Sequence, residues 1–270
     1  VLVAAFAGLV AWLNLRGEAP VAADAAPSSG TPQQIARGEY LALAGNCMTC
    51  HTTRGGLPYA GGRGIATPFG TVYAGNLTPD VETGLGRWSA DHFWRALHHG
   101  RSRDGRLLVP AFPYPNYTQV TRDDADALFA YLQSLPAVAQ VRRPHALRFP
   151  YDTQVALALW RALFFRAGEF VPDPAKDAAW NRGAYLVGGL GHCAACHAPR
   201  NAFGATTDSP SLGGGLIPMQ KWYAPSLASP REAGVADWPQ TEVVQLLKTG
   251  RTDRGSVLGP MAEVVLRSTQ

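Results

Sequence analysis

The feature that most constrains this 270-residue chain is a short pattern, Cys-x-x-Cys-His, that occurs twice and contains all four cysteines. The first copy covers residues 47–51 and the second covers residues 193–197. This pattern is the attachment signature of haem c, because two thiols in one helical turn can each bind one vinyl group while the adjacent imidazole reaches the iron. The predicted thioether residues are Cys47, Cys50, Cys193 and Cys196, and the predicted iron ligands are His51 and His197.

Two other chemistries use paired cysteines. A zinc site with four cysteine ligands would leave the histidine of both motifs without a role, and a long stretch of chain separates the two pairs. A redox dithiol of the thioredoxin type would need a βαβ context, which the sequence does not show. Two haems c are therefore the expected cofactors of this segment.

An internal repeat surrounds the motifs. Segment 37–41 reads Arg-Gly-Glu-Tyr-Leu and segment 182–186 reads Arg-Gly-Ala-Tyr-Leu. From residue 71 to residue 110, matching positions such as Trp88 and Trp238 lie 150 residues apart. Several matches at one offset indicate a duplicated domain. We expect a first domain over residues 33–140, a linking segment over 141–176 and a second domain over 177–270, whose last helix would follow residue 270.

Apolar spacing predicts short helices joined by long loops. Three helices begin after capping residues Thr31, Ser89 and Thr121, and a fourth covers residues 152–166. The expected inward residues are Ile35, Ala36, Tyr40 and Leu43, then Phe93, Ala96 and Leu97, then Ala125, Leu128, Phe129, Leu132 and Leu135. Beyond glycine-rich turns at 55–75 and 212–224 the sequence shows no convincing strand alternation, so the expected fold class is all-α with long loops.

The N-terminal 13 residues are apolar throughout, and Arg16 ends the run. This run is shorter than the roughly 20 residues that span a bilayer. Residues 1–16 are read as part of a membrane anchor or, alternatively, as a signal segment with a cleavage-like Ala23-Asp24-Ala25 downstream. A buried helix of a cytoplasmic protein is a third interpretation. Residues 17–32 are expected to form a linker.

The sixth iron ligand would distinguish an electron carrier from an open, reactive haem. Met261 follows Gly259-Pro260 and is the candidate for the second haem, whereas Met219 is expected to pack and Met48 is poorly placed. For the first haem His92, His98, His99 and His145 stay open as candidates, with His98 and His99 expected at a solvated helix end. A methionine from another domain and an absent sixth ligand stay open as well. The arginines expected to pair with haem propionates are Arg37, Arg101, Arg182 and Arg251.

These features resemble the multihaem cytochrome c subunit of periplasmic, membrane-bound bacterial dehydrogenases for alcohol, aldehyde, gluconate and isoquinoline-type substrates. The residues that carry the resemblance are the first motif, Ala-Phe-Pro-Tyr-Pro at 111–115, Trp-Tyr-Ala-Pro at 222–225 and Gly-Pro-Met-Ala-Glu-Val-Val at 259–265. The resemblance implies two tandem class I cytochrome c domains, with a third haem domain expected after residue 270. Met261 matches an axial methionine of the family, but Phe112 stands where many members have one.

The resemblance also implies a function. Electrons from a periplasmic dehydrogenase partner (a molybdenum hydroxylase, quinoprotein or flavoprotein) would pass through the haems to ubiquinone or a terminal oxidase. The chain itself would transform no substrate and would lie on the periplasmic side of the bacterial inner membrane. A formal charge of +4 is too small to indicate nucleic-acid binding. The alternative is a dihaem peroxidase-like enzyme or ligand sensor with an open first haem.

Overall fold

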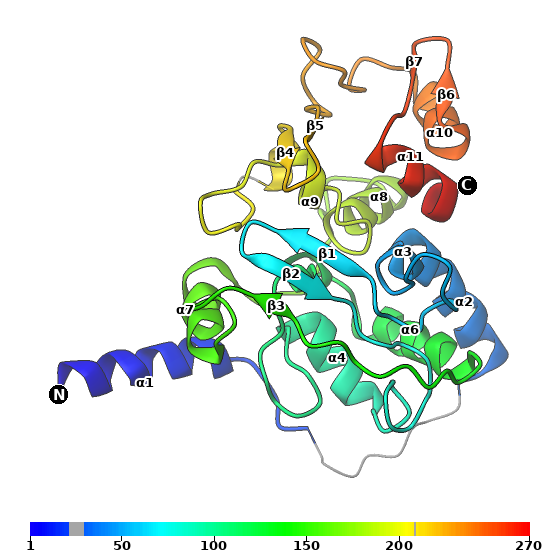
Figure 1. Cartoon of the computed structure of the whole chain (residues 1–270). Coiled ribbons are helices and arrows are strands. Elements are labelled where there is room, and N and C mark those ends of the chain that lie inside the picture. The colour runs from blue at the N-terminus through cyan, green and yellow to red at the C-terminus, as the bar shows by residue number, and fades with distance from the viewer. Residues whose placement is uncertain (22–29, 208) are drawn as a thin grey trace.

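The computed structural model describes residues 1–21, 30–207 and 209–270. Short helices joined by long loops make up most of it, and Figure 1 shows the part of the chain from residue 178 onward, yellow-green to red, lying above the part before it. The central part of the expected linker, which includes Ala23-Asp24-Ala25, lies outside the described residues.

The helices have the following bounds. They are α1 (Leu2–Leu15), α2 (Pro32–Ala44), α3 (Cys47–Cys50), α4 (Ala90–His99), α5 (Tyr114–Tyr117), α6 (Arg122–Ser134), α7 (Gln154–Phe164), α8 (Ala178–Gly188), α9 (Ala194–His197), α10 (Gln240–Thr249) and α11 (Pro260–Val264). A 3-10 turn, η1 (Ser209–Ser211), and a π-helical turn, η2 (Val265–Thr269), complete the set.

Short strands correct the all-α expectation. They are β1 (Gly64–Thr67), β2 (Gly70–Tyr73), β3 (Ala146–Leu147), β4 (Gly215–Ile217), β5 (Trp222–Ala224), β6 (Arg251–Thr252) and β7 (Gly255–Ser256). They pair antiparallel as β1-β2-β3, β4-β5 and β6-β7. The β1-β2 and β4-β5 hairpins occupy the two glycine-rich segments, where strands of three or four residues are too short to display an alternating pattern.

The two repeats share one order of elements. In the first, α2 leads through the motif turn α3 to the β1-β2 hairpin and then to α4. In the second, α8 leads through α9 to the β4-β5 hairpin and then to α10. The repeated sequence segments thus form corresponding structures, and we use first repeat for residues 33–140 and second repeat for residues 177–270.

Helix α2 packs closely against α6. A capping box at Thr31 and Gln34 begins α2, as its sequence predicts. The predicted inward face was wrong, however, because Tyr40 and Leu43 are exposed, whereas Gly38, Leu41 and Ala42 are buried. Gly38 explains the difference. A Cβ there would lie 2.0 Å from the Ala127 carbonyl oxygen, so only glycine lets the two backbones approach this closely.

The inward faces predicted for α4 and α6 are confirmed. Phe93, Ala96 and Leu97 of α4 are buried, and α6 buries its own apolar stripe. The α6 residues concerned are Ala125, Leu128, Phe129 and Leu132, while Leu135 after the helix packs partly buried against them. Together with α2 these helices form the hydrophobic core of the first repeat.

A buried carboxylate joins the two repeats. Asp124 on α6 is only 1% exposed. It accepts a 2.6 Å hydrogen bond from Arg37 Nε on α2 and a 2.7 Å bond from the Tyr185 hydroxyl on α8. Arg182 Nη1 of α8 lies 3.5 Å from Oδ2, the carboxylate oxygen that also accepts from Tyr185, whereas Arg37 contacts Oδ1. A buried charge needs such partners, so the four side chains hold the repeats in one arrangement.

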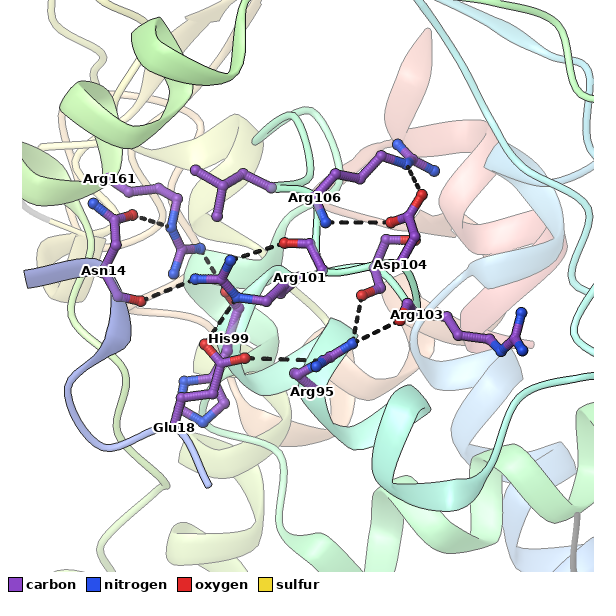
Figure 2. Close-up of polar contacts among 12 residues, drawn as sticks. Asn14, Glu18, Arg95, His99, Arg101, Arg103, Asp104, Arg106 and Arg161 are labelled. Atoms are coloured by element: carbon purple, nitrogen blue, oxygen red, sulfur yellow. Dashed lines mark hydrogen bonds and ion pairs between the residues drawn. The ribbon is translucent and has the colours of Figure 1, made fainter. Parts of the chain in front are cut away.

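The N-terminal segment is tied by polar contacts to α7 and to the first repeat, as Figure 2 shows. Asn14 at the end of α1 accepts a 2.8 Å bond from Arg161 Nε on α7. Glu18 accepts a 2.9 Å bond from Arg101 and lies 3.9 Å from Arg95. Among the described residues, no helix is both long and apolar enough to span a membrane, and α1 itself has 14 residues.

The Gly38 packing makes a testable prediction. Gly38→Ala should lower the free energy of unfolding by about 1–2 kcal/mol, because overpacking costs about 1–3 kcal/mol and outweighs the gain in helix propensity. Gly183→Ala at the corresponding place on α8 is the matched control, since a Cβ there meets nothing within 4 Å among the described residues. It should stabilise by up to about 1 kcal/mol. Guanidinium unfolding followed by circular dichroism measures both, and equal effects would contradict the packing argument.

Candidate haem-attachment site

The first motif is a single helical turn. Asn46 precedes it in the left-handed conformation, with φ of +50°. Asparagine tolerates this conformation better than most residues, so it suits the start of the turn. Cys47 and Cys50 begin and end α3 and are half-buried and exposed, respectively. The turn therefore presents both thiols from one short element, followed directly by His51.

The imidazole of His51 is oriented by the backbone. Its Nδ1 lies 2.7 Å from the carbonyl oxygen of Gly75, which follows the β1-β2 hairpin. A carbonyl only accepts, so Nδ1 must carry the hydrogen and Nε2 keeps its lone pair. Burial lowers the pKa of His51, and the bond to Gly75 opposes this lowering. The neutral imidazole with a free Nε2 is the form that binds a metal ion.

The second motif repeats this geometry. His192, with φ of +37°, occupies the position that Asn46 has in the first motif. His197 Nδ1 lies 2.8 Å from the carbonyl oxygen of Pro225. Gly75 and Pro225 are 150 residues apart, at the offset of the repeat. Two separate parts of the chain thus leave the Nε2 atom of the motif histidine available in the same way.

The cysteines have a common electrostatic environment. The surrounding protein desolvates all four thiols, including Cys50 with its accessible surface, and raises their pKa values, for Cys47 to about 12. Without a bound group the thiols stay protonated near neutral pH, which does not suit a redox dithiol. In the described part of the chain, no group of three or more His, Cys, Asp or Glu residues is placed to hold a metal ion, so a four-cysteine zinc site has no support. Two thiols beside one oriented imidazole fit haem c.

Met261 lies in α11, half-buried, directly after Gly259-Pro260. A Cβ on Gly259 would come within 2.6 Å of the Trp222 ring, so this turn packs tightly on the β5 strand. Glu263 accepts a 3.0 Å bond from Arg63, which also donates to the Thr49 carbonyl inside the first motif. The short helix α11, which carries the candidate ligand Met261, is therefore linked through Glu263 to the attachment turn of the first motif.

The other two methionines, Met219 and Met48, differ in their burial. Met219 stands exposed in the turn between β4 and β5, with 62% of its surface accessible, so its expected packing role is wrong. Met48 packs partly buried against the core of the first repeat. Phe112 packs against the same core, with its ring centroid 5.3 Å from that of Tyr117.

The four histidines considered as sixth ligand of the first haem all make contacts within the protein. His98 and His99 are buried rather than solvated, which corrects the expectation for them. His98 stacks on Trp94 with ring centroids 4.5 Å apart, and burial together with nearby positive charge lowers the pKa of His99 to about 4. His92 lies 2.8 Å from the Ser89 hydroxyl within the capping box of α4, and His145 accepts a 3.1 Å bond from the Tyr73 amide.

Three of the four repeated arginines contact carboxylates of the chain. Arg37 and Arg182 both contact Asp124, and Arg101 contacts Glu18. Spacing alone did not reveal these carboxylates, because each lies far from its arginine in sequence. The carbonyls of Gly75 and Pro225 were also missed as histidine partners, although their equal offset in the repeat was a signal that would have found them.

Comparison with known proteins identifies the family. A family model described as cytochrome c matches residues 35–136. The chain is 34% identical over 281 residues to a dihaem c-type cytochrome of Cereibacter sphaeroides, covering 100% of this chain and 90% of that one.

Two longer relatives are also similar. The chain is 44% identical over 264 residues to a nicotinate dehydrogenase subunit of Pseudomonas putida and 40% identical over 244 residues to the gluconate 2-dehydrogenase cytochrome c subunit of Pantoea cypripedii. These matches cover 97% and 87% of this chain but 22% and 55% of the relatives, so the chain corresponds to only part of their length. The chain belongs to the family of c-type cytochromes, which bind haem c covalently and include the cytochrome c subunits of bacterial dehydrogenases.

Proposed function

We propose that this chain carries two covalently bound haems c and passes electrons from a periplasmic dehydrogenase partner to ubiquinone or a terminal oxidase. The observation that carries the proposal is the repeated histidine geometry. His51 and His197 each hold Nδ1 on a backbone carbonyl, so the lone pair stays on Nε2, and each directly follows the second cysteine of its motif. Haem c supplies a one-electron iron couple when it is bound.

The chain's own residues would attach, ligate and tune that group. Cys47 and Cys50 would hold one haem, and Cys193 and Cys196 the other, by thioether bonds. The Nδ1 bonds to Gly75 and Pro225 fix the imidazole planes and raise the basicity of Nε2. Met261 is the proposed sixth ligand of the second haem, because it follows Gly259-Pro260 in the second repeat and is half-buried in α11. A Met/His pair would raise the reduction potential. Residues 33–140 and 177–270 are then the two haem domains.

The relatives support a dehydrogenase partner, because several are named as dehydrogenase subunits. The substrates in their names differ, so the proposed partner is a molybdenum hydroxylase, a quinoprotein or a flavoprotein. Residues 1–16 are proposed as part of an anchor on the periplasmic side of the inner membrane. Leu2, Val3 and Phe6 on α1 are exposed, as lipid contact would require. The peroxidase-like or sensor alternative has no relative among those compared that favours it.

Covalent attachment can be tested one motif at a time. A Cys47→Ala, Cys50→Ala double variant should lose one of two haems, and a Cys193→Ala, Cys196→Ala variant should lose the other. Each should take up half as many electrons as the wild type in an anaerobic reductive titration, because each haem accepts one electron. Pyridine-haemochrome quantitation and haem staining of denaturing gels measure the content. Full covalent retention in either variant would exclude the assigned cysteines.

The axial role of Met261 gives a second test. Met261→Ala should lower the potential of one haem by a sizeable part of the roughly 0.8 V that axial ligands span. It should also abolish the long-wavelength absorption band of methionine bound to ferric iron. Met219→Ala is the matched control, since Met219 is exposed and should leave both unchanged. If both variants keep the wild-type potentials and band, Met261 is not a ligand.

A further inference from the structure

The residue directly before each motif has the same backbone conformation but a different side chain. Asn46 and His192 both have positive φ, at +50° and +37°. Asparagine satisfies this conformation in the first repeat, and its side chain accepts from Thr49 within its own motif. Backbone conformation alone would therefore be met by asparagine in the second repeat as well. The imidazole of His192 needs a separate explanation.

The His192 imidazole reaches across to the first repeat. Its ring lies edge-to-face with Tyr117, at a centroid distance of 5.7 Å and an interplanar angle of 71°. The backbone carbonyl of Gly45 also lies near the ring, where it opposes the lowering of the pKa of His192 by burial. Tyr117 is buried in the core of the first repeat, and Gly45 lies two residues before Cys47. One side chain next to Cys193 thus contacts the segment that leads into the first motif.

The neighbouring residue Leu190 reinforces the same contact. It is 1% exposed and belongs to the hydrophobic core of the first repeat, although it comes from the second. A Cβ on Gly45 would lie 3.4 Å from Leu190 Cδ2 and 3.3 Å from Cys47 Sγ. The space around Gly45, between the two attachment segments, is therefore filled. If residues 190–193 moved, they would lose their contacts with Gly45 and Tyr117.

We propose that His192 is a positioning residue that fixes the second haem-attachment segment against the first and thereby sets the rate of electron exchange between the two haems. This inference rests on the proposed electron-transfer function. The exchange moves one electron from the ferrous to the ferric centre and makes or breaks no bond. His192 takes no part in that transfer. It acts through the separation of the two segments that carry Cys47 and Cys193.

The test is His192→Asn in the haem-loaded protein. Asparagine keeps the left-handed backbone, as Asn46 does, but removes the ring contact with Tyr117. Amide hydrogen exchange in segments 41–50 and 186–193 should become about tenfold faster, since the exchange of protected amides follows the local opening equilibrium. Electron equilibration between the haems after flash photoreduction should become at least severalfold slower, with haem content unchanged.

Tyr185→Phe is the control. It removes a hydrogen bond to Asp124 at the same interface and leaves His192 untouched. It should speed exchange in α6 and α8 but leave the inter-haem rate at the wild-type value. An inter-haem rate that falls equally in both variants would show that general docking, not His192, sets the separation. A wild-type inter-haem rate in His192→Asn would overturn the inference directly.

If His192→Asn does not retain the second haem, a second variant keeps the inference testable. Tyr117→Leu removes the same ring contact from the first repeat and leaves the second motif intact. It should also slow the inter-haem rate, and a wild-type rate would again overturn the inference. Haem quantitation of the wild type separates the two proposals, because fewer than two haems per chain would refute the proposed function whatever His192 does.

Discussion

The hydrogen bond from each motif histidine to a backbone carbonyl is the interaction on which the rest of this structure depends. It joins the short Cys-x-x-Cys-His turn to the segment after a hairpin, 24 residues later in the first repeat and 28 in the second. The hairpins β1-β2 and β4-β5 therefore do more than connect helices, since they place Gly75 and Pro225 where Nδ1 can donate. The imidazole is held in the tautomer and orientation that an iron ligand requires.

The second constraint is the junction between the repeats. Asp124 is a buried carboxylate whose removal from water is costly, and Arg37, Arg182 and Tyr185 offset that cost from both repeats. A second polar contact between the repeats runs from the first motif through Arg63 to Glu263, two residues after Met261. These polar contacts and the apolar packing of Leu190 together define one arrangement of the two attachment turns.

The sequence predicted what depends on local chemistry and failed where distant residues decide. Helices α4 and α6 followed from apolar spacing, and the motifs follow from residue type and order. The inward face of α2 was predicted wrongly because its contact with α6 is made at a glycine, Gly38. A close approach of two helix backbones leaves no pattern of apolar residues in the sequence. The partners of Arg37 and Arg182 and the burial of His98 and His99 depend on segments far along the chain. The short hairpins lack the length that makes alternation visible.

Low-temperature EPR of the oxidised, purified protein, combined with haem quantitation, tests the central claim most directly. That claim is an electron carrier in which two equivalent attachment turns each hold one haem c. It predicts two haems per chain and two low-spin ferric signals, because a carrier keeps both axial positions of each iron filled. A high-spin signal from half of the iron would contradict it, since an open first haem belongs to an enzyme or a ligand sensor.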